Sequence, residues 1–141
     1  MTGNDLPALS IAGLQLLLRR REVSPREVID ALRARIETVD RDIGAYLSLD
    51  IEAALKDAEH ANVDLPLGGI PIAIKDIITV MGQPCTCGSK ILHGYRAPYN
   101  ATVIQKLREA GAIPFGQTNL DESAMGWSTE NAALKKQRNP W

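Results

Sequence analysis

The stretch LGGIPIAIKD, residues 67–76, indicates the fold of this 141-residue chain. Isoleucine recurs at every second position, 70, 72 and 74, and these side chains therefore fall on one face of a β-strand. Pro71, Ala73 and Lys75 fall on the opposite face. Alternation of this kind is typical of a strand with one buried face. The sequence therefore predicts a strand that ends at Lys75.

A helix and a second strand are predicted after a polar loop over residues 81–90. Asn100 is placed to cap a helix with apolar side chains at helical spacing, and Gly111 stands where a left-handed C-terminal cap is expected. Residues 112–116, AIPFG, predict a strand in which Pro114 favours an edge or exit position. Strand, helix and strand in this order form a βαβ-like crossover, which favours parallel pairing of the two strands.

The N-terminal part of the chain is predicted to be mainly helical. Ser10 is placed to cap a first helix, and the segment SPRE at residues 24–27 has the pattern of a capping box at the start of a second helix. We expect these two helices to form a hairpin that buries its apolar stripe against a larger body. A short strand over 45–49 and an alanine-rich helix over 51–60 follow.

The chain shows no internal repeat and no domain boundary. We expect residues 1–62 to be mainly helical and residues 63–141 to begin an α/β core, with no separate second domain. The predicted fold class is α/β, with helices packed on a mixed β-sheet that is incomplete in this chain. Two Trp, three Tyr and one Phe are the only aromatic residues, so the core is expected to consist of Ile, Leu, Val and Ala.

Charge and composition argue against several functional classes. The chain has 16 Lys and Arg against 17 Asp and Glu, which argues against direct electrostatic binding of nucleic acid. No apolar run approaches the ~18 residues of a membrane span, and the N-terminus lacks a secretory pattern, so we expect a cytoplasmic protein without membrane contact. Cys85 and Cys87 are interpreted as reduced thiols in a loop, and His60 and His93 lack a third ligand, so no metal site is expected.

Two features are candidates for chemistry on local grounds. Lys75 ends an apolar strand beside the small Ala73, where desolvation in a confined space would lower its pKa, although a strand-end lysine that reaches solvent fits the same pattern. Residues 116–131 are rich in small and amide-bearing residues, as a ligand-lining loop is, and a plain irregular loop has the same composition.

Several segments in order resemble a known family. These segments are GGIPIAIKDIITV (68–80), CGSKIL (87–92), APYNATVIQKLREAGAIPFGQTN (97–119), LDESAMGWSTENAA (120–133) and RNPW (138–141). They resemble the first part of the amidase signature family. Within it they are most similar to the A subunits of the glutamyl-tRNA(Gln)/aspartyl-tRNA(Asn) amidotransferases. The resemblance covers essentially the whole chain and implies the N-terminal part of an amidase-signature fold.

The resemblance also implies a chemistry and a set of residues. The family hydrolyses amides with a serine nucleophile, a bridging serine and a lysine. Lys75 matches that lysine, which is neutral in a buried site and takes the proton relayed from the nucleophile through the bridging serine. The segment that holds Met125, Gly126, Ser128 and Thr129 matches the part of the family that lies beside the substrate pocket.

The sequence departs from the family pattern in three places. Both triad serines belong to a glycine- and serine-rich stretch that is expected soon after Trp141, so we expect the 141-residue chain alone to be inactive. Trp127 stands where the amidotransferase subunits have a small residue, and this difference would change the shape of the pocket. Residues 134–137, LKKQ, replace an aromatic residue and a glycine-containing turn, which concerns the geometry of the final loop.

The resemblance implies substrates and partners as well. The amidotransferase subunit hydrolyses glutamine and supplies ammonia that amidates Glu or Asp carried by a misacylated tRNA. The B and C subunits complete a heterotrimer, in which tRNA, ATP and Mg²⁺ are bound mainly by the large partner subunit, and this chain needs no cofactor of its own. Two alternatives stay open: another amidase-signature hydrolase of a small amide, or a non-catalytic truncated interaction module. An unpaired sheet edge also predicts self-association.

Overall fold

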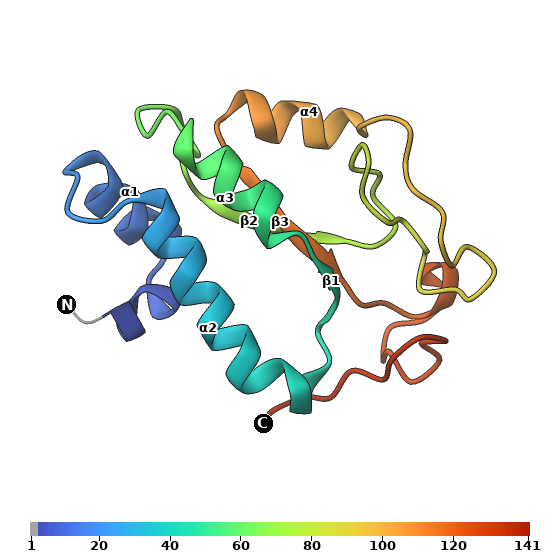
Figure 1. Cartoon of the computed structure of the whole chain (residues 1–141). Helices are drawn as coiled ribbons and strands as arrows, with labels where there is room; N and C mark the ends of the chain where they lie inside the picture. Colours follow the sequence, from blue (N-terminus) through green and yellow to red (C-terminus); the bar gives the residue numbers. More distant parts are fainter. Residues whose placement is uncertain (1–2) are drawn as a thin grey trace.

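The computed structural model describes residues 3–141 and shows an α/β fold with helices packed on a mixed sheet, as predicted (Figure 1). The elements in chain order are η1 (Gly3–Ala8), α1 (Ile11–Arg19), α2 (Pro25–Ile43), β1 (Tyr46–Leu49), α3 (Ile51–Glu59), β2 (Pro71–Lys75), α4 (Thr102–Glu109), β3 (Ile113–Thr118) and η2 (Glu122–Ala124). The predicted helical hairpin corresponds to α1 and α2, and α3 lies in front of the strands in Figure 1.

In the described part of the chain the sheet has three strands, in the order β1-β3-β2. β3 pairs with β2 in parallel, with Lys75 opposite Thr118. On its other side β3 pairs with β1 in antiparallel orientation. The parallel pairing predicted from the strand–helix–strand order is therefore confirmed, and the carboxyl ends of β2 and β3 lie side by side.

The expected position of Pro114 at an edge or exit is wrong, because β3 is the central strand. Proline is tolerated there because β1 is short and pairs with β3 only from Gly116 to Thr118. The neighbouring Ile113 N–H donates to Ile70 O at 2.9 Å, so the next backbone position faces away from β2. The nitrogen of Pro114, which has no hydrogen, thus lies beyond the end of the pairing between β1 and β3. No hydrogen bond of the sheet is lost there.

Two of the three predicted N-terminal caps are present. Ser10 Oγ accepts the Gly13 N–H at 3.2 Å, and Ser24 forms the complete capping box with Glu27. The predicted cap at Asn100 is wrong: Ala101 occupies that position of α4, and Asn100 Oδ1 accepts the Met81 N–H at 2.8 Å instead. The short Asn side chain therefore closes the loop before α4 rather than capping the helix.

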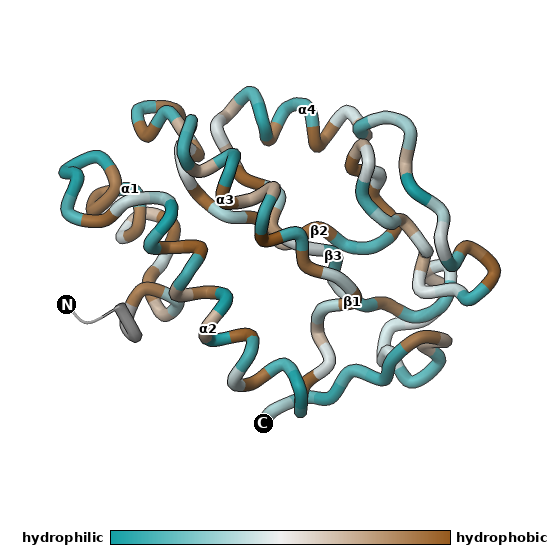
Figure 2. The backbone as a smooth tube through the Cα atoms, in the orientation of Figure 1, coloured by the Kyte–Doolittle hydropathy of each residue, from teal (hydrophilic) through white to brown (hydrophobic). Residues whose placement is uncertain are grey.

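Across residues 3–141 the buried side chains form three clusters. The first lies under α1 and α2 and includes Leu18 and Val28. The second joins α2 and α3 to β3, with Ile29 and Phe115 at its centre, and the third places Ile74 of β2 against α4. Aliphatic residues supply almost all of this core, as the composition predicted. The segment after β3 is largely hydrophilic, in contrast to the strands (Figure 2).

Candidate functional site

The carboxyl ends of the two parallel strands bring together the segments that the sequence singled out. β2 ends at Lys75 and β3 ends at its partner Thr118, so the chain leaves both strands at the same edge. In parallel sheets this edge is where ligands bind most often. Along β2, Ile74 is buried, whereas Ala73 and Lys75 are exposed, which confirms the predicted alternation. Within the described residues the Lys75 side chain reaches solvent.

Asp76 follows Lys75 directly and is almost completely buried, with 1% of its surface exposed. Its carboxylate accepts the backbone N–H of Thr86 at 3.0 Å and that of Gly88 at 3.2 Å, and it also accepts the Thr86 hydroxyl. Its carbonyl accepts the Cys87 N–H at 2.8 Å. One buried charge therefore shapes the loop of residues 85–89 and anchors it beside the end of β2.

Asp121 lies three residues after the end of β3 and is also buried, with 3% of its surface exposed. Its Oδ2 accepts the Thr129 N–H and its Oδ1 accepts the Asn131 N–H, each at 2.9 Å. The loop of residues 122–131 thus closes on a carboxylate, as the 85–89 loop does.

These two loops contact each other. The Ser123 N–H donates to Cys87 O at 2.7 Å, and Ser89 Oγ donates to Glu122 Oε1 at 2.5 Å. Gly88 has φ +65°, and a Cβ there would lie 2.8 Å from Leu120 O, so a side chain would separate the loops. The edge beyond β2 and β3 is therefore one connected structure built from both loops.

The 122–131 loop contains unusual backbone. Ser123, Ala124 and Thr129 have φ of 56°, 57° and 59°, in the left-handed region that non-glycine residues seldom adopt. Such conformations cost of order 1–3 kcal/mol each and cluster at functional sites. All three fall within seven consecutive residues of the 122–131 loop.

A cavity of about 530 Å³ opens where the loops meet. It is lined by Ser89, Ile91, Asp121, Glu122, Ser123, Met125, Gly126 and Asn131. Of the residues expected beside a substrate, the structure brings Met125 and Gly126 together at this cavity. Ser128, Thr129 and Lys75 are outside its lining, and Ser128 Oγ donates to the Glu130 carboxylate at 3.0 Å.

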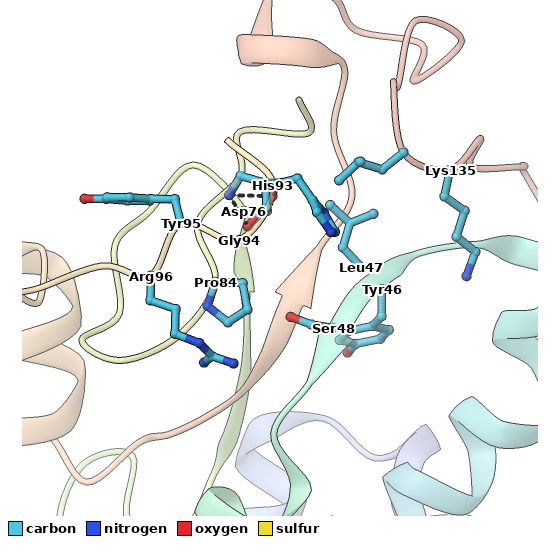
Figure 3. A pocket seen from close by; sticks show the side chains of 12 residues that line it. Tyr46, Leu47, Ser48, Asp76, Pro84, His93, Gly94, Tyr95, Arg96 and Lys135 are labelled. Carbon is cyan, nitrogen blue, oxygen red and sulfur yellow. Dashed lines mark hydrogen bonds between the residues drawn. The ribbon is translucent and has the colours of Figure 1, made fainter. Parts of the chain in front are cut away.

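A second cavity, of about 490 Å³, lies between β1 and the segment from Pro84 to Arg96 (Figure 3). Ser48 Oγ is directed into this space from β1 and has no hydrogen-bond partner among residues 3–141. The two cations at its rim are engaged elsewhere, because Lys135 pairs with Asp40 at 3.2 Å and Arg96 donates to Gly82 O at 2.7 Å.

The two cysteines have different environments. Cys85 is buried, Cys87 is half-buried, and both are free thiols. Burial raises the pKa of the Cys85 thiol to about 11, so it is a poor nucleophile at neutral pH. Within residues 3–141 no group of three or more His, Cys, Asp or Glu side chains is placed to hold a metal ion, and no helix is long and apolar enough to cross a membrane.

Asp76 and Asp121 shape the site but were not among the residues that the sequence pattern predicted there. The N–H groups that these two carboxylates accept lie eight to twelve residues further along the chain, so the local sequence carried no signal for them.

Comparison with known proteins gives the class to which this fold and site belong. The amidase family profile matches residues 27–141, and the chain belongs to the amidase family. The A subunit of the glutamyl-tRNA(Gln) amidotransferase of Methylacidiphilum infernorum is 55% identical over 94% of this chain. The alignment spans 27% of that relative's length, so these 141 residues correspond to one part of a longer protein.

Solved structures show the same architecture. The structure of a 6-aminohexanoate cyclic dimer hydrolase matches 94% of this chain and 28% of its own, with 31% identity and a TM-score of 0.88. The structure of the glutamyl-tRNA(Gln) amidotransferase A subunit from Thermotoga maritima matches 100% of this chain and 27% of its own chain, with 31% identity and a TM-score of 0.68. The chain corresponds to the N-terminal portion of amidase-signature structures.

Proposed function

We propose that this chain forms the N-terminal portion of the glutamine-hydrolysing subunit of a tRNA-dependent amidotransferase. The observation that carries the proposal is the 55% identity over 94% of the chain to a protein named as that subunit. The fold supports it, because the edge where β2 and β3 end carries both Lys75 and the 122–131 loop.

In this proposal Lys75 supplies the base. The Lys75 amine at the end of β2 would accept the proton of the serine nucleophile through the bridging serine and return it to the departing ammonia. Within residues 3–141 the Lys75 side chain projects from the exposed face of β2, opposite the buried Ile74, so in this proposal the remainder of the enzyme would enclose the reacting amine. The two serines would come from residues beyond Trp141, so the isolated chain is expected to be inactive.

The 122–131 loop supplies substrate contacts in the same proposal. Met125 and Gly126 line the 530 Å³ cavity, and Ser128 and Thr129 follow in a segment of strained backbone. Glutamine, a small polar amide, is the substrate that the sequence identity favours.

The partners follow from the same identity. Ammonia would pass to a large subunit that binds tRNA, ATP and Mg²⁺, and a small subunit would complete the heterotrimer in the cytoplasm. The near-neutral chain, with 16 basic and 17 acidic residues, fits a protein that does not bind tRNA by charge.

A different amidase is the second candidate. The TM-score of 0.88 with 6-aminohexanoate cyclic dimer hydrolase exceeds the 0.68 with the Thermotoga subunit. Backbone similarity of this kind does not determine the substrate, which depends on the residues around the reacting amide.

A substrate panel distinguishes the candidates. A chimera would carry residues 1–141 in place of the matching segment of the Methylacidiphilum A subunit, within its own heterotrimer. We expect ammonia release from glutamine, little from aliphatic or cyclic amides, and no release by residues 1–141 alone. A chimera that hydrolyses aliphatic or cyclic amides in preference to glutamine would favour the second candidate.

A further inference from the structure

Asp121 has a role that neither the family resemblance nor the sequence pattern assigned. We infer that Asp121 is the positioning residue of the 122–131 loop, and that it shapes this segment for substrate binding. The inference rests on the proposed function, since it concerns the same reaction. Asp121 is a positioning residue rather than a catalytic one, because it acts through the backbone of the residues that follow it.

The hydrogen bonds of Asp121 account for this role. Each carboxylate oxygen accepts one backbone N–H, from Thr129 and from Asn131, both at 2.9 Å. These donors lie eight and ten residues further along the chain, so a single side chain closes the whole loop. Charge-assisted bonds to a carboxylate that is 3% exposed are stronger than ordinary amide bonds.

Gly126 lets the loop approach this carboxylate. A Cβ built on Gly126 would overlap Asp121 Oδ2, closer than real contacts allow. Its φ is not in the left-handed region, so closeness to Asp121 rather than backbone conformation explains the glycine. The backbone between Met125 and Trp127 is thereby held against the buried charge.

The loop is strained where Asp121 holds it. Ser123, Ala124 and Thr129 have positive φ, and Thr129 is itself a donor to Asp121. The Ala124 N–H also donates to the Asp121 backbone carbonyl at 2.8 Å. Without the carboxylate the loop would lose the bonds that offset this strain, and Met125 and Gly126 would leave their places at the cavity.

The first test uses Asp121→Asn in the chimera. An asparagine keeps the shape but has one acceptor oxygen, so it accepts only one of the two N–H groups and faces the other with its own donor. We expect KM for glutamine to rise about tenfold while kcat changes less than about threefold, the size of effect expected for one lost hydrogen bond to a charged group. Asp64→Asn, at an exposed carboxylate, is the matched control and should leave both constants unchanged.

The second test needs no activity. In residues 1–141, amide exchange measured by NMR should show protection at Thr129 and Asn131 that Asp121→Asn removes, with amides of α2 unaffected. Gly126→Ala should disturb the same amides, and its effect should be smaller in an Asp121→Ala background, where the clash is absent.

The outcomes separate this inference from the proposed function. An inactive chimera with Asp121 intact counts against the proposed function, and the exchange data still test the loop. If Asp121→Asn leaves KM unchanged, or leaves Thr129 and Asn131 protected, the positioning role is wrong. Changes in kcat and KM no larger than those of Asp64→Asn would likewise contradict the positioning role of Asp121.

Discussion

At the scale of single residues, the site depends on two buried carboxylates whose partners lie far along the chain. The place of Lys75 on the exposed face of β2 was predictable, because strand alternation put it opposite the buried Ile74. Asp76 was not, because its acceptor role depends on N–H groups of residues 86 and 88, which become neighbours only after the loop has folded. A sequence pattern contains no information on such bonds until the loop path is known.

Asp76→Ala should therefore destabilise the fold strongly. The substitution leaves the Thr86 and Gly88 N–H groups buried without acceptors, and each unsatisfied group costs about 1–3 kcal/mol. We expect the free energy of unfolding, measured by urea denaturation, to fall by about 3 kcal/mol. Asp42→Ala, at an exposed position of α2, should change it by less than about 0.5 kcal/mol. Equal effects of both substitutions would contradict this account.

At the scale of elements, the sequence predicted the helices and strands well. It predicted less well which segments lie next to each other in space. The capping box at Ser24 and the left-handed Gly111, with φ +91°, depend on residues close in sequence, and both are present. The placement of Pro114 failed because sheet order and the short length of β1 depend on the whole chain. The prediction of a cap at Asn100 was wrong because the N–H of Met81, nineteen residues earlier, donates to the same side chain.

Ser24→Ala should weaken α2 in a pH-dependent way. The loss of a Ser cap costs about 1 kcal/mol of protein stability near neutral pH. The Ser24 hydroxyl and, with a smaller effect, the Ser24 backbone N–H donate hydrogen bonds to Glu27 and lower the pKa of its carboxyl. Because this pKa is lowered on folding, Glu27 contributes to the free energy of unfolding above its ordinary pKa of 4.5. This contribution is lost as the pH falls through the lowered pKa of the folded state.

The difference in unfolding free energy between wild type and Ser24→Ala should accordingly narrow from neutral pH to about pH 3. Urea denaturation at the two pH values measures it, with Thr38→Ala, near the C-terminal end of the same helix, as the control. A difference that widens on acidification would show that the capping box is not formed in solution.

At the scale of the whole molecule, the described chain leaves one side of β2 unpaired and several large apolar side chains exposed. Within residues 3–141, β2 pairs with β3 alone, and Ile91, Met125 and Trp127 are 89%, 88% and 97% exposed. The sequence predicted an aliphatic α/β core and an unpaired sheet edge, but not which apolar side chains would be exposed, because exposure depends on what else covers the sheet. Unpaired strand edges and exposed apolar groups favour association.

We therefore expect residues 1–141 to self-associate as concentration rises, measured by sedimentation velocity. Ala73→Lys places a charge on the exposed face of β2 and should reduce association. Ala34→Lys, at an exposed position of α2, adds the same charge elsewhere and should not. A monomer at every concentration would contradict this prediction.

We propose Lys75 as the base of an amide-hydrolysing site at the carboxyl ends of β2 and β3. The most direct measurement is kcat for glutamine hydrolysis by the chimera with Lys75→Ala, compared with Lys106→Ala at an exposed position of α4. The account predicts that kcat falls by about 10²–10⁴ in the first variant, as for loss of a general base, and stays unchanged in the second. Retention of full activity by Lys75→Ala would contradict it.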